Sequence, residues 1–193
     1  MADRGVPAPR VVAAVACLWL LAGGGRTGAD LRVVADTVVG YDAFAEHVTA
    51  RHPDIDRFYL RTLYDHYVRE CRIEGVSLLV ALSQMLLETD YLRFTGSVRA
   101  VQYNYAGIGA TDTGVAGDVF PNMRTGVRAH VQHLKAYGDA EPLSQVVVDP
   151  RFHLVRRGSA QTVPALTGRW ATDPAYHEKL LAHAERLSAS DVR

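Results

Sequence analysis

Several features are scarce in this chain of 193 residues, and each scarcity excludes a class of protein. Basic and acidic residues balance at 21 each, so the composition gives no reason to expect a nucleic-acid-binding protein. The sequence contains no low-complexity tract, no repeat with a period of about 20–50 residues, and no phosphate- or dinucleotide-binding glycine motif. Hydrophobic residues make up 48% of the chain, which is ordinary for one globular domain and too high for a disordered protein.

Long hydrophobic runs are also scarce. The apolar run near the N-terminus, Val11 to Ala22, has about a dozen residues, whereas a membrane-spanning helix needs about 20. Arg4 and Arg10 precede this run and small residues follow it, which is typical of a cleavable export signal. We therefore expect residues 1–29 to be a signal peptide and residues 30–193 to form one domain in the periplasm or at the cell surface. An uncleaved membrane anchor is the alternative.

Cysteine occurs only twice, and only Cys71 lies outside the expected signal peptide. An internal disulfide bond is therefore excluded for the mature domain. Cys71 falls on the apolar side of an expected helix, where we expect it to be buried. The stability of the domain must then come from packing.

The hydrophobic pattern of the mature chain predicts a mainly α-helical, single-domain protein. Caps at Asp54 or Asp56, at Ser77 and at Thr162, and a stop at Gly75, help to delimit the helices. The expected helices run approximately over 41–51, 57–73, 78–87, 125–137, a short segment after Thr162, and from Asp173 to 188. Between them lies a glycine-rich stretch in which residues 115–120 are expected to form part of a short β-hairpin.

One carboxylate stands at an unusual place. Glu88 closes the helix over 78–87, which is apolar nearly all round and should be buried on most sides. Burial and the helix dipole both disfavour the charged form there, so both should raise the pKa of Glu88. A carboxyl that is protonated near neutral pH can act as a general acid on a leaving oxygen. A solvated glutamate at a helix end is the competing interpretation.

Three segments carry motifs in a fixed order. Residues 82–89 read Leu-Ser-Gln-Met-Leu-Leu-Glu-Thr, residues 104–110 read Asn-Tyr-Ala-Gly-Ile-Gly-Ala, and residues 171–179 contain Ala-Thr-Asp-Pro-Ala-Tyr followed by Lys179. These segments resemble the Ala-x-Ala-x-Leu-Glu-Ser/Thr, Asn-Asn-x-Phe-Gly-Ile and Tyr-Ala-Thr-Asp-Pro-x-Tyr-x-x-Lys motifs of one family. That family is the glucosaminidase domain of family 73 glycoside hydrolases, which includes autolysins and flagellar muramidase-type enzymes.

The resemblance implies a small, mainly α-helical, lysozyme-like fold with a β-hairpin lobe. It also implies hydrolysis of the β-1,4 bond between N-acetylglucosamine and N-acetylmuramic acid in peptidoglycan, with Glu88 as the general acid and no cofactor. Two alternatives share this type of fold: a non-catalytic glycan-binding or scaffold protein, and a lytic transglycosylase. A cell-envelope or flagellar assembly partner is compatible with each of these functions.

The resemblance further suggests a second carboxylate in the hairpin, about thirty residues after the acid. Asp118 lies 30 positions after Glu88, and Asp112 is the alternative. An aspartate that serves only in a turn is the competing interpretation for both. If neither carboxylate reaches the sugar, the 2-acetamido group of the substrate can act as the nucleophile.

Amides and aromatic rings suit a sugar-binding groove, and glycine allows close approach of the backbone. The residues expected to shape this groove are Asn104, Tyr105, Gly107, Tyr176 and Trp170. Packing in the core is the competing interpretation for Tyr176 and Trp170. His130 and His133 lie three residues apart on one expected helix, but no third ligand stands at a diagnostic spacing, so we predict no metal site.

Overall fold

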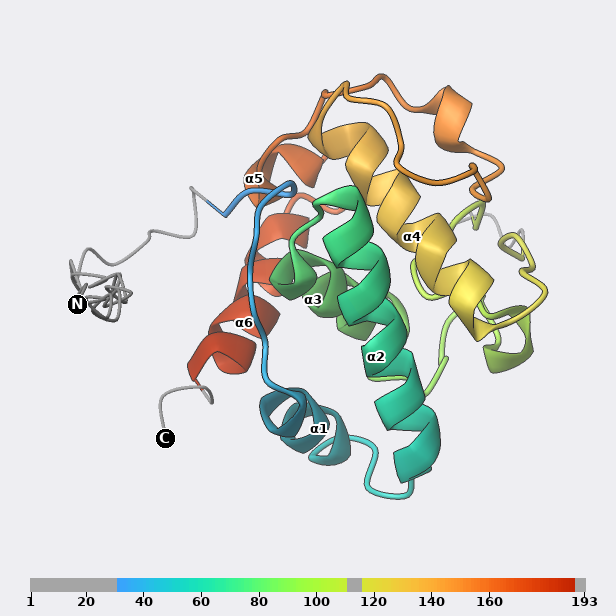
Figure 1. The fold of residues 1–193 in the computed structure, drawn as a ribbon. Helices are drawn as coiled ribbons and strands as arrows, with labels where there is room; N and C mark the ends of the chain where they lie inside the picture. The colour runs from blue at the N-terminus through green and yellow to red at the C-terminus, as the bar shows by residue number, and fades with distance from the viewer. Residues whose placement is uncertain (1–30, 111–115, 190–193) are drawn as a thin grey trace, which may run out of the picture.

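The computed structural model describes residues 31–110 and 116–189 (Figure 1). The expected signal peptide and Asp112 therefore lie outside the described residues. Within them the α-helices are Tyr41–Thr49 (α1), Arg57–Glu74 (α2), Leu78–Glu88 (α3), Met123–Gly138 (α4), Val163–Leu166 (α5) and Tyr176–Ala189 (α6). Two short 3-10 helices, Ala100–Gln102 (η2) and Phe152–Leu154 (η3), lie in the connecting loops. The prediction of a mainly α-helical protein is confirmed.

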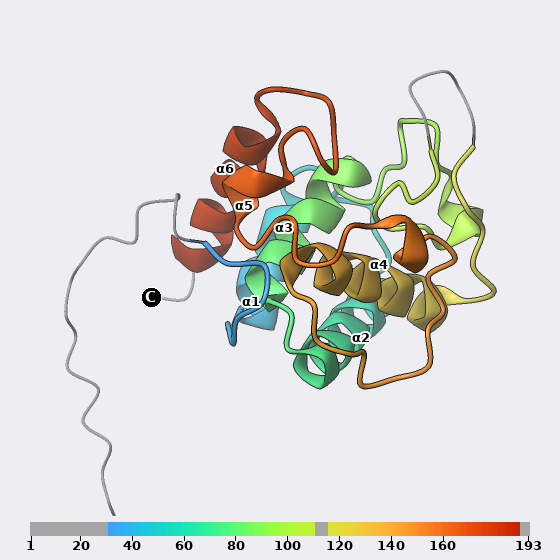
Figure 2. The same ribbon diagram turned by 90° about the horizontal axis from the view of Figure 1, so that it is seen from above.

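Helix α3 lies at the centre of the fold. It packs against α6 on one side and contacts α2 and α4 on the other, as Figure 1 and Figure 2 show. Eight of its eleven residues are buried, which confirms the burial expected of a helix that is apolar nearly all round. Because α3 is fixed on several sides, its C-terminal residue Glu88 has a well-defined position.

Local signals explain where α2 begins and ends and where α3 begins. The side chain of Asp56 accepts a hydrogen bond from the backbone nitrogen of Tyr59 at 2.6 Å and so caps α2. Gly75 ends the helix with φ +71°, a left-handed conformation that glycine adopts without strain. Ser77 then caps α3 by accepting from the backbone nitrogen of Val80 at 3.2 Å. These caps confirm the helix boundaries that the sequence predicts.

Helices α4 and α6 begin at different residues from those predicted, whereas α5 begins directly after Thr162 as expected. The side chain of Asn122 accepts a hydrogen bond from the backbone nitrogen of Thr125 at 2.9 Å, so α4 starts directly after Asn122. Helix α6 starts three residues after Asp173, whose side chain accepts from the backbone nitrogen of Ala175 at 2.9 Å. In both places a turn formed by a side chain decides where the helix begins.

The predicted β-hairpin is not seen in the part of the chain that the structure describes. That part contains no strand and only the isolated bridges Arg32–Thr162, Val34–Val76 and Thr167–Ala171. The described residues of the expected hairpin, 116–120, are irregular. Their backbone is nevertheless anchored, because Asp118 donates to the carbonyl of Ile108 at 2.8 Å and Phe120 donates to that of Gln102 at 2.9 Å.

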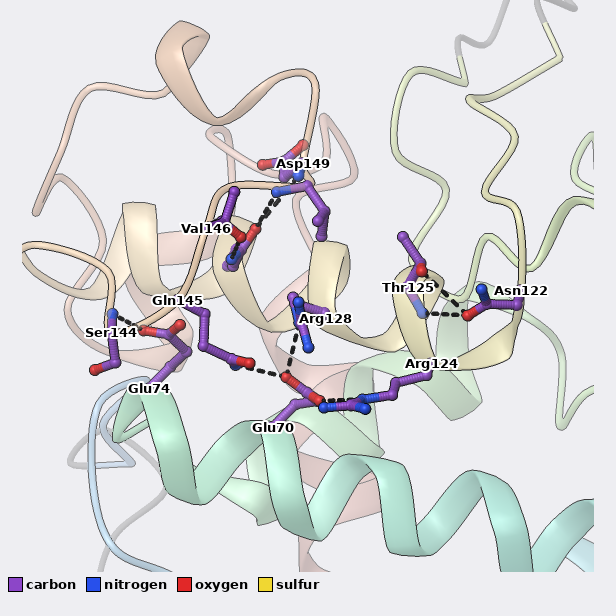
Figure 3. Close-up of polar contacts among 12 residues, drawn as sticks. Glu70, Glu74, Asn122, Arg124, Thr125, Arg128, Ser144, Gln145, Val146 and Asp149 are labelled. Carbon is purple, nitrogen blue, oxygen red and sulfur yellow. Dashed lines mark hydrogen bonds and ion pairs between the residues drawn. The ribbon is translucent and has the colours of Figure 1, made fainter.

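An ion cluster around a buried carboxylate joins α2 to α4 and to the loop that follows (Figure 3). The carboxylate of Glu70 is fully buried and accepts hydrogen bonds from Arg124 and Arg128 at 3.1 Å each and from Gln145 at 2.6 Å. Burial raises the pKa of Glu70, but the hydrogen bonds from Gln145, Arg128 and Arg124 outweigh it and lower the pKa overall. The cluster therefore holds a charged carboxylate between two helices.

Cys71 is buried, as its position on the apolar side of α2 predicts. Burial raises the pKa of its thiol far above the ordinary value. Among the helices that the structure describes, none combines the length and apolar character that crossing a membrane requires.

Candidate active site

A cleft of about 590 Å³ opens at the C-terminal end of α3. Its walls are formed by Glu88, the loop 96–98, Ala106 with Gly107, Ala110, and the segment 170–173. The three sequence segments singled out by their motifs therefore meet at one cavity. A cavity of this volume lies in the range of small-molecule sites, and Glu88 provides a titratable group in its wall.

The two carboxyl oxygens of Glu88 have different surroundings. Oε1 accepts a hydrogen bond from the hydroxyl of Tyr176 at 2.6 Å. Oε2 lies beside Gly107, where an added β-carbon would approach it to 3.3 Å. Gly107 also has φ +64°, so the absence of a side chain there serves both the turn and the space around the carboxyl.

Burial raises the pKa of Glu88 to about 7, although hydrogen bonding from Tyr176 and Trp170 acts in the opposite direction. The direction agrees with the sequence-based expectation for a carboxyl at the end of an apolar helix. A carboxyl with this pKa is about half protonated at neutral pH. It is thus suited to give a proton to a bound ligand.

Two aromatic side chains support Glu88. Tyr176 is only 4% exposed, and its hydroxyl accepts a hydrogen bond from Nε2 of Gln84 at 2.7 Å. Trp170 lines the cleft and is partly buried. Its ring packs against those of His133 and His130, with centroids 5.0 and 5.9 Å away. Of the three aromatic residues predicted at the groove, Tyr176 and Trp170 therefore lie next to Glu88 and also pack against the core.

Two other residues predicted to shape the sugar groove lie inside the protein. Asn104 is fully buried. Its Nδ2 donates to the carbonyl of Ile108 at 2.8 Å and to that of Asp118 at 3.0 Å. Its Oδ1 accepts from the backbone nitrogen of Ile108 at 3.0 Å. Tyr105 is 1% exposed, and its hydroxyl lies 3.2 Å from that of Tyr59. Asn104 therefore fastens the loop beside the cleft, and Tyr105 belongs to the core. Their part in shaping the sugar groove stays a prediction.

Asp118, the candidate second carboxylate, forms an ion pair. Nε of Arg151 donates to Oδ2 of Asp118 at 2.8 Å. The side chain of Arg151 is 42% exposed and that of Asp118 is 29% exposed. A β-carbon added at Gly109 would come within 2.7 Å of this carboxylate oxygen. Asp118 is not among the residues that line the cleft holding Glu88. Its role as a base stays a prediction.

The two histidines considered as metal ligands have different partners. Nδ1 of His133 lies 2.6 Å from Oδ2 of Asp149, whereas the ring of His130 lies between Tyr67 and Gln84. Within residues 31–110 and 116–189, no three side chains of the metal-binding types gather around one point. Gln84 is not among the site residues predicted from the sequence, although a polar residue one turn before Glu88 in an apolar helix is a usable signal.

Comparison with known proteins extends these observations. A family model described as glucosaminidase, mannosyl-glycoprotein endo-beta-N-acetylglucosaminidase, matches residues 64–189. An uncharacterized protein of Borreliella burgdorferi (strain B31) is 46% identical over 129 residues, which cover 67% of this chain. The match spans 63% of the length of that relative. No solved structure matches the chain significantly. The matched region contains Glu88, Gly107, Trp170 and Tyr176.

Proposed function

The chain belongs to the glucosaminidase family, and we propose that it is a peptidoglycan hydrolase in which Glu88 is the general acid. The bond cleaved is the β-1,4 linkage between N-acetylglucosamine and N-acetylmuramic acid. The observation that carries this proposal is the position of Glu88 in the cleft wall, with a pKa raised to about 7. We also propose that the domain is exported, because its substrate lies outside the cytoplasm.

In the proposed reaction, the glycan strand lies in the cleft with its scissile oxygen near Oε2 of Glu88. The carboxyl donates its proton to this oxygen as the bond to the anomeric carbon breaks. The leaving sugar then departs as an alcohol, and positive charge develops on the ring that remains. Tyr176 stabilises the carboxylate that forms on Glu88, because its hydroxyl already donates to Oε1 at 2.6 Å.

Two groups are candidates for the opposite face of the sugar. Asp118, which forms an ion pair with Arg151, would remove a proton from water that attacks the anomeric carbon. Alternatively, the carbonyl oxygen of the 2-acetamido group would attack first, and water would open the ring that results. Asp118→Asn should lower kcat roughly a hundredfold or more in the first case. In the second case a substrate with a fluorinated acetamido group should be cleaved much more slowly, and Asp118→Asn should stay active.

Digestion of purified peptidoglycan tests the main proposal. The wild-type protein should release fragments with reducing N-acetylglucosamine ends, detected by reduction and mass spectrometry. Glu88→Gln should lower kcat by about 10²- to 10⁴-fold, because an amide cannot transfer a proton to the leaving oxygen. Glu178→Gln, an exposed glutamate on α6, is the matched control and should behave as wild type.

Other products would identify the alternatives. Anhydro-sugar ends would mean that the protein is a lytic transglycosylase. If the folded wild-type protein binds glycan but releases no fragment, the hydrolase proposal is wrong and a binding or scaffold function takes its place.

A further inference from the structure

Four buried polar side chains form a continuous hydrogen-bond relay behind Glu88. Its members are Tyr67 on α2, His130 on α4, Gln84 on α3 and Tyr176 on α6. The hydroxyl of Tyr67 lies 2.8 Å from Nδ1 of His130, and Nε2 of His130 lies 2.9 Å from Oε1 of Gln84. Nε2 of Gln84 lies 2.7 Å from the hydroxyl of Tyr176, which reaches Glu88 at 2.6 Å. The relay thus connects four helices to one oxygen of the carboxyl.

The chemistry of each group fixes the direction of these bonds. The amide nitrogen of Gln84 can only donate, so the hydroxyl of Tyr176 accepts from it and uses its own proton for Glu88. The amide oxygen of Gln84 can only accept, so Nε2 of His130 carries a proton. In a neutral imidazole the other nitrogen is then an acceptor, and the hydroxyl of Tyr67 donates to it.

His130 is held in the neutral state that this direction requires. Burial lowers its pKa to about 3, and the nearby His133 acts in the same direction. The groups that face its ring are Tyr67, Gln84 and Trp170, and none of them carries a charge. The imidazole therefore keeps a single proton over the pH range in which Glu88 titrates.

The direction of the relay favours one oxygen of Glu88 as the carrier of the acidic proton. Because Tyr176 donates to Oε1, a proton on Glu88 belongs on Oε2, which lies beside Gly107 in the cleft. If the amide of Gln84 were reversed, Tyr176 would donate to it and Glu88 would have to donate to Tyr176. The proton would then point into the protein and away from a bound sugar.

We propose that Gln84, His130 and Tyr67 are positioning residues that hold Tyr176 as a donor to Oε1 of Glu88 and so place the acidic proton on Oε2. This inference rests on the proposed function, because it assigns these residues a part in the action of the acid. Hydrogen bonding accounts for their burial, because each of these polar groups has a partner within the relay.

Gln84→Met and Tyr67→Phe test the inference in the full chain. Gln84→Met keeps the length of the side chain but leaves the hydroxyl of Tyr176 free to rotate. We expect kcat on peptidoglycan to fall about tenfold or more, with little change in KM. Tyr67→Phe removes only the first donor and should give a smaller loss. Tyr59→Phe is the matched control, because its hydroxyl bonds to Tyr105 outside the relay, and its kcat should equal that of wild type.

The pKa of Glu88, measured by carbon-13 NMR, separates positioning from a merely structural role. Hydrogen bonding from Tyr176 lowers this pKa, so weakening it in Gln84→Met should move the pKa above about 7. A loosened core would instead admit water and move the pKa down, towards the ordinary value of 4.5. Nitrogen-15 NMR should also show His130 protonated on Nε2 in wild type.

The inference is overturned if His130 carries its proton on Nδ1, or if the pKa of Glu88 falls or stays constant in both relay variants. If the wild type is active, the inference is also overturned when kcat falls no further in Gln84→Met and Tyr67→Phe than it does in Tyr59→Phe. If Gln84→Met does not fold, Tyr67→Phe provides the same comparisons. A wild type that cleaves no glycan refutes the proposed function, and the assigned catalytic part of the relay with it, whatever the NMR results.

Discussion

The raised pKa of Glu88 should make the protein less stable as the pH rises, and Glu88→Gln should remove this effect. The folded protein holds the proton up to a pKa of about 7, whereas the unfolded chain releases it near the ordinary value of 4.5. Between these values the folded state binds more protons, so the free energy of unfolding decreases as the pH rises. At 1.36 kcal/mol per pKa unit, the decrease approaches about 3 kcal/mol above pH 7. The glutamine side chain of the variant has a similar shape and does not titrate.

Urea denaturation of wild type and Glu88→Gln at pH 4.5 and pH 8.5 measures this difference. The variant should gain stability relative to wild type by about 3 kcal/mol between the two pH values. Other groups, including the buried histidines, are present in both proteins and cancel in the comparison. If the stability difference between the two proteins is the same at both pH values, Glu88 does not have a raised pKa in the folded state. Both the burial argument for Glu88 and its suitability as a general acid would then fail.

Three further predictions concern the cleft and the core. Since Glu88 must be protonated to act, kcat should decline as the pH rises through about 7, and a pH–rate profile that stays flat up to pH 9 would contradict its role. Gly107→Ala should lower kcat about tenfold and the free energy of unfolding by about 1 kcal/mol, because the residue has φ +64° and the new methyl group would lie 3.3 Å from Oε2 of Glu88. Kinetics and thermal denaturation measure the two effects, and a variant equal to wild type in both would refute the prediction. Glu70→Gln should lower the free energy of unfolding by about 2 kcal/mol, since it removes the buried charge that Arg124 and Arg128 share. Urea denaturation measures this loss, and an unchanged denaturation midpoint would show that the charge of Glu70 contributes nothing to stability.

The helices could be predicted because their signals are local. Asp56 and Ser77 act on backbone groups three residues away, and Gly75 needs no partner to adopt a left-handed turn. The direction of the pKa shift of Glu88 could be predicted in the same way, since an apolar helix that ends in a carboxylate predicts a raised pKa without any tertiary information. Features of this kind depend on sequence neighbours that the chain itself specifies.

The burial of Asn104 and Tyr105 could not be predicted in this way. Residue types suited to sugar binding are also suited to fastening a loop or filling a core, and only the tertiary structure decides which way each side chain points. Asn104 faces the backbone of its own loop, with two hydrogen bonds from its amide group to carbonyls. Tyr105 faces α2 and meets the hydroxyl of Tyr59. A loop sequence therefore predicts that a site lies nearby more reliably than it predicts the contacts.

Only part of the relay behind Glu88 could have been predicted from the sequence. Gln84 precedes Glu88 by four residues, so both lie on one face of α3, and an amide on that face of an apolar helix requires partners. The sequence could thus have predicted a buried polar contact next to the acid. It could not have named the partners, because His130 and Tyr176 follow Gln84 by 46 and 92 residues and reach it only through the packing of α4 and α6 against α3. The spacing of His130 and His133 in the sequence suggests a metal site, whereas in the structure the ring of His130 is held by the amide of Gln84 on α3.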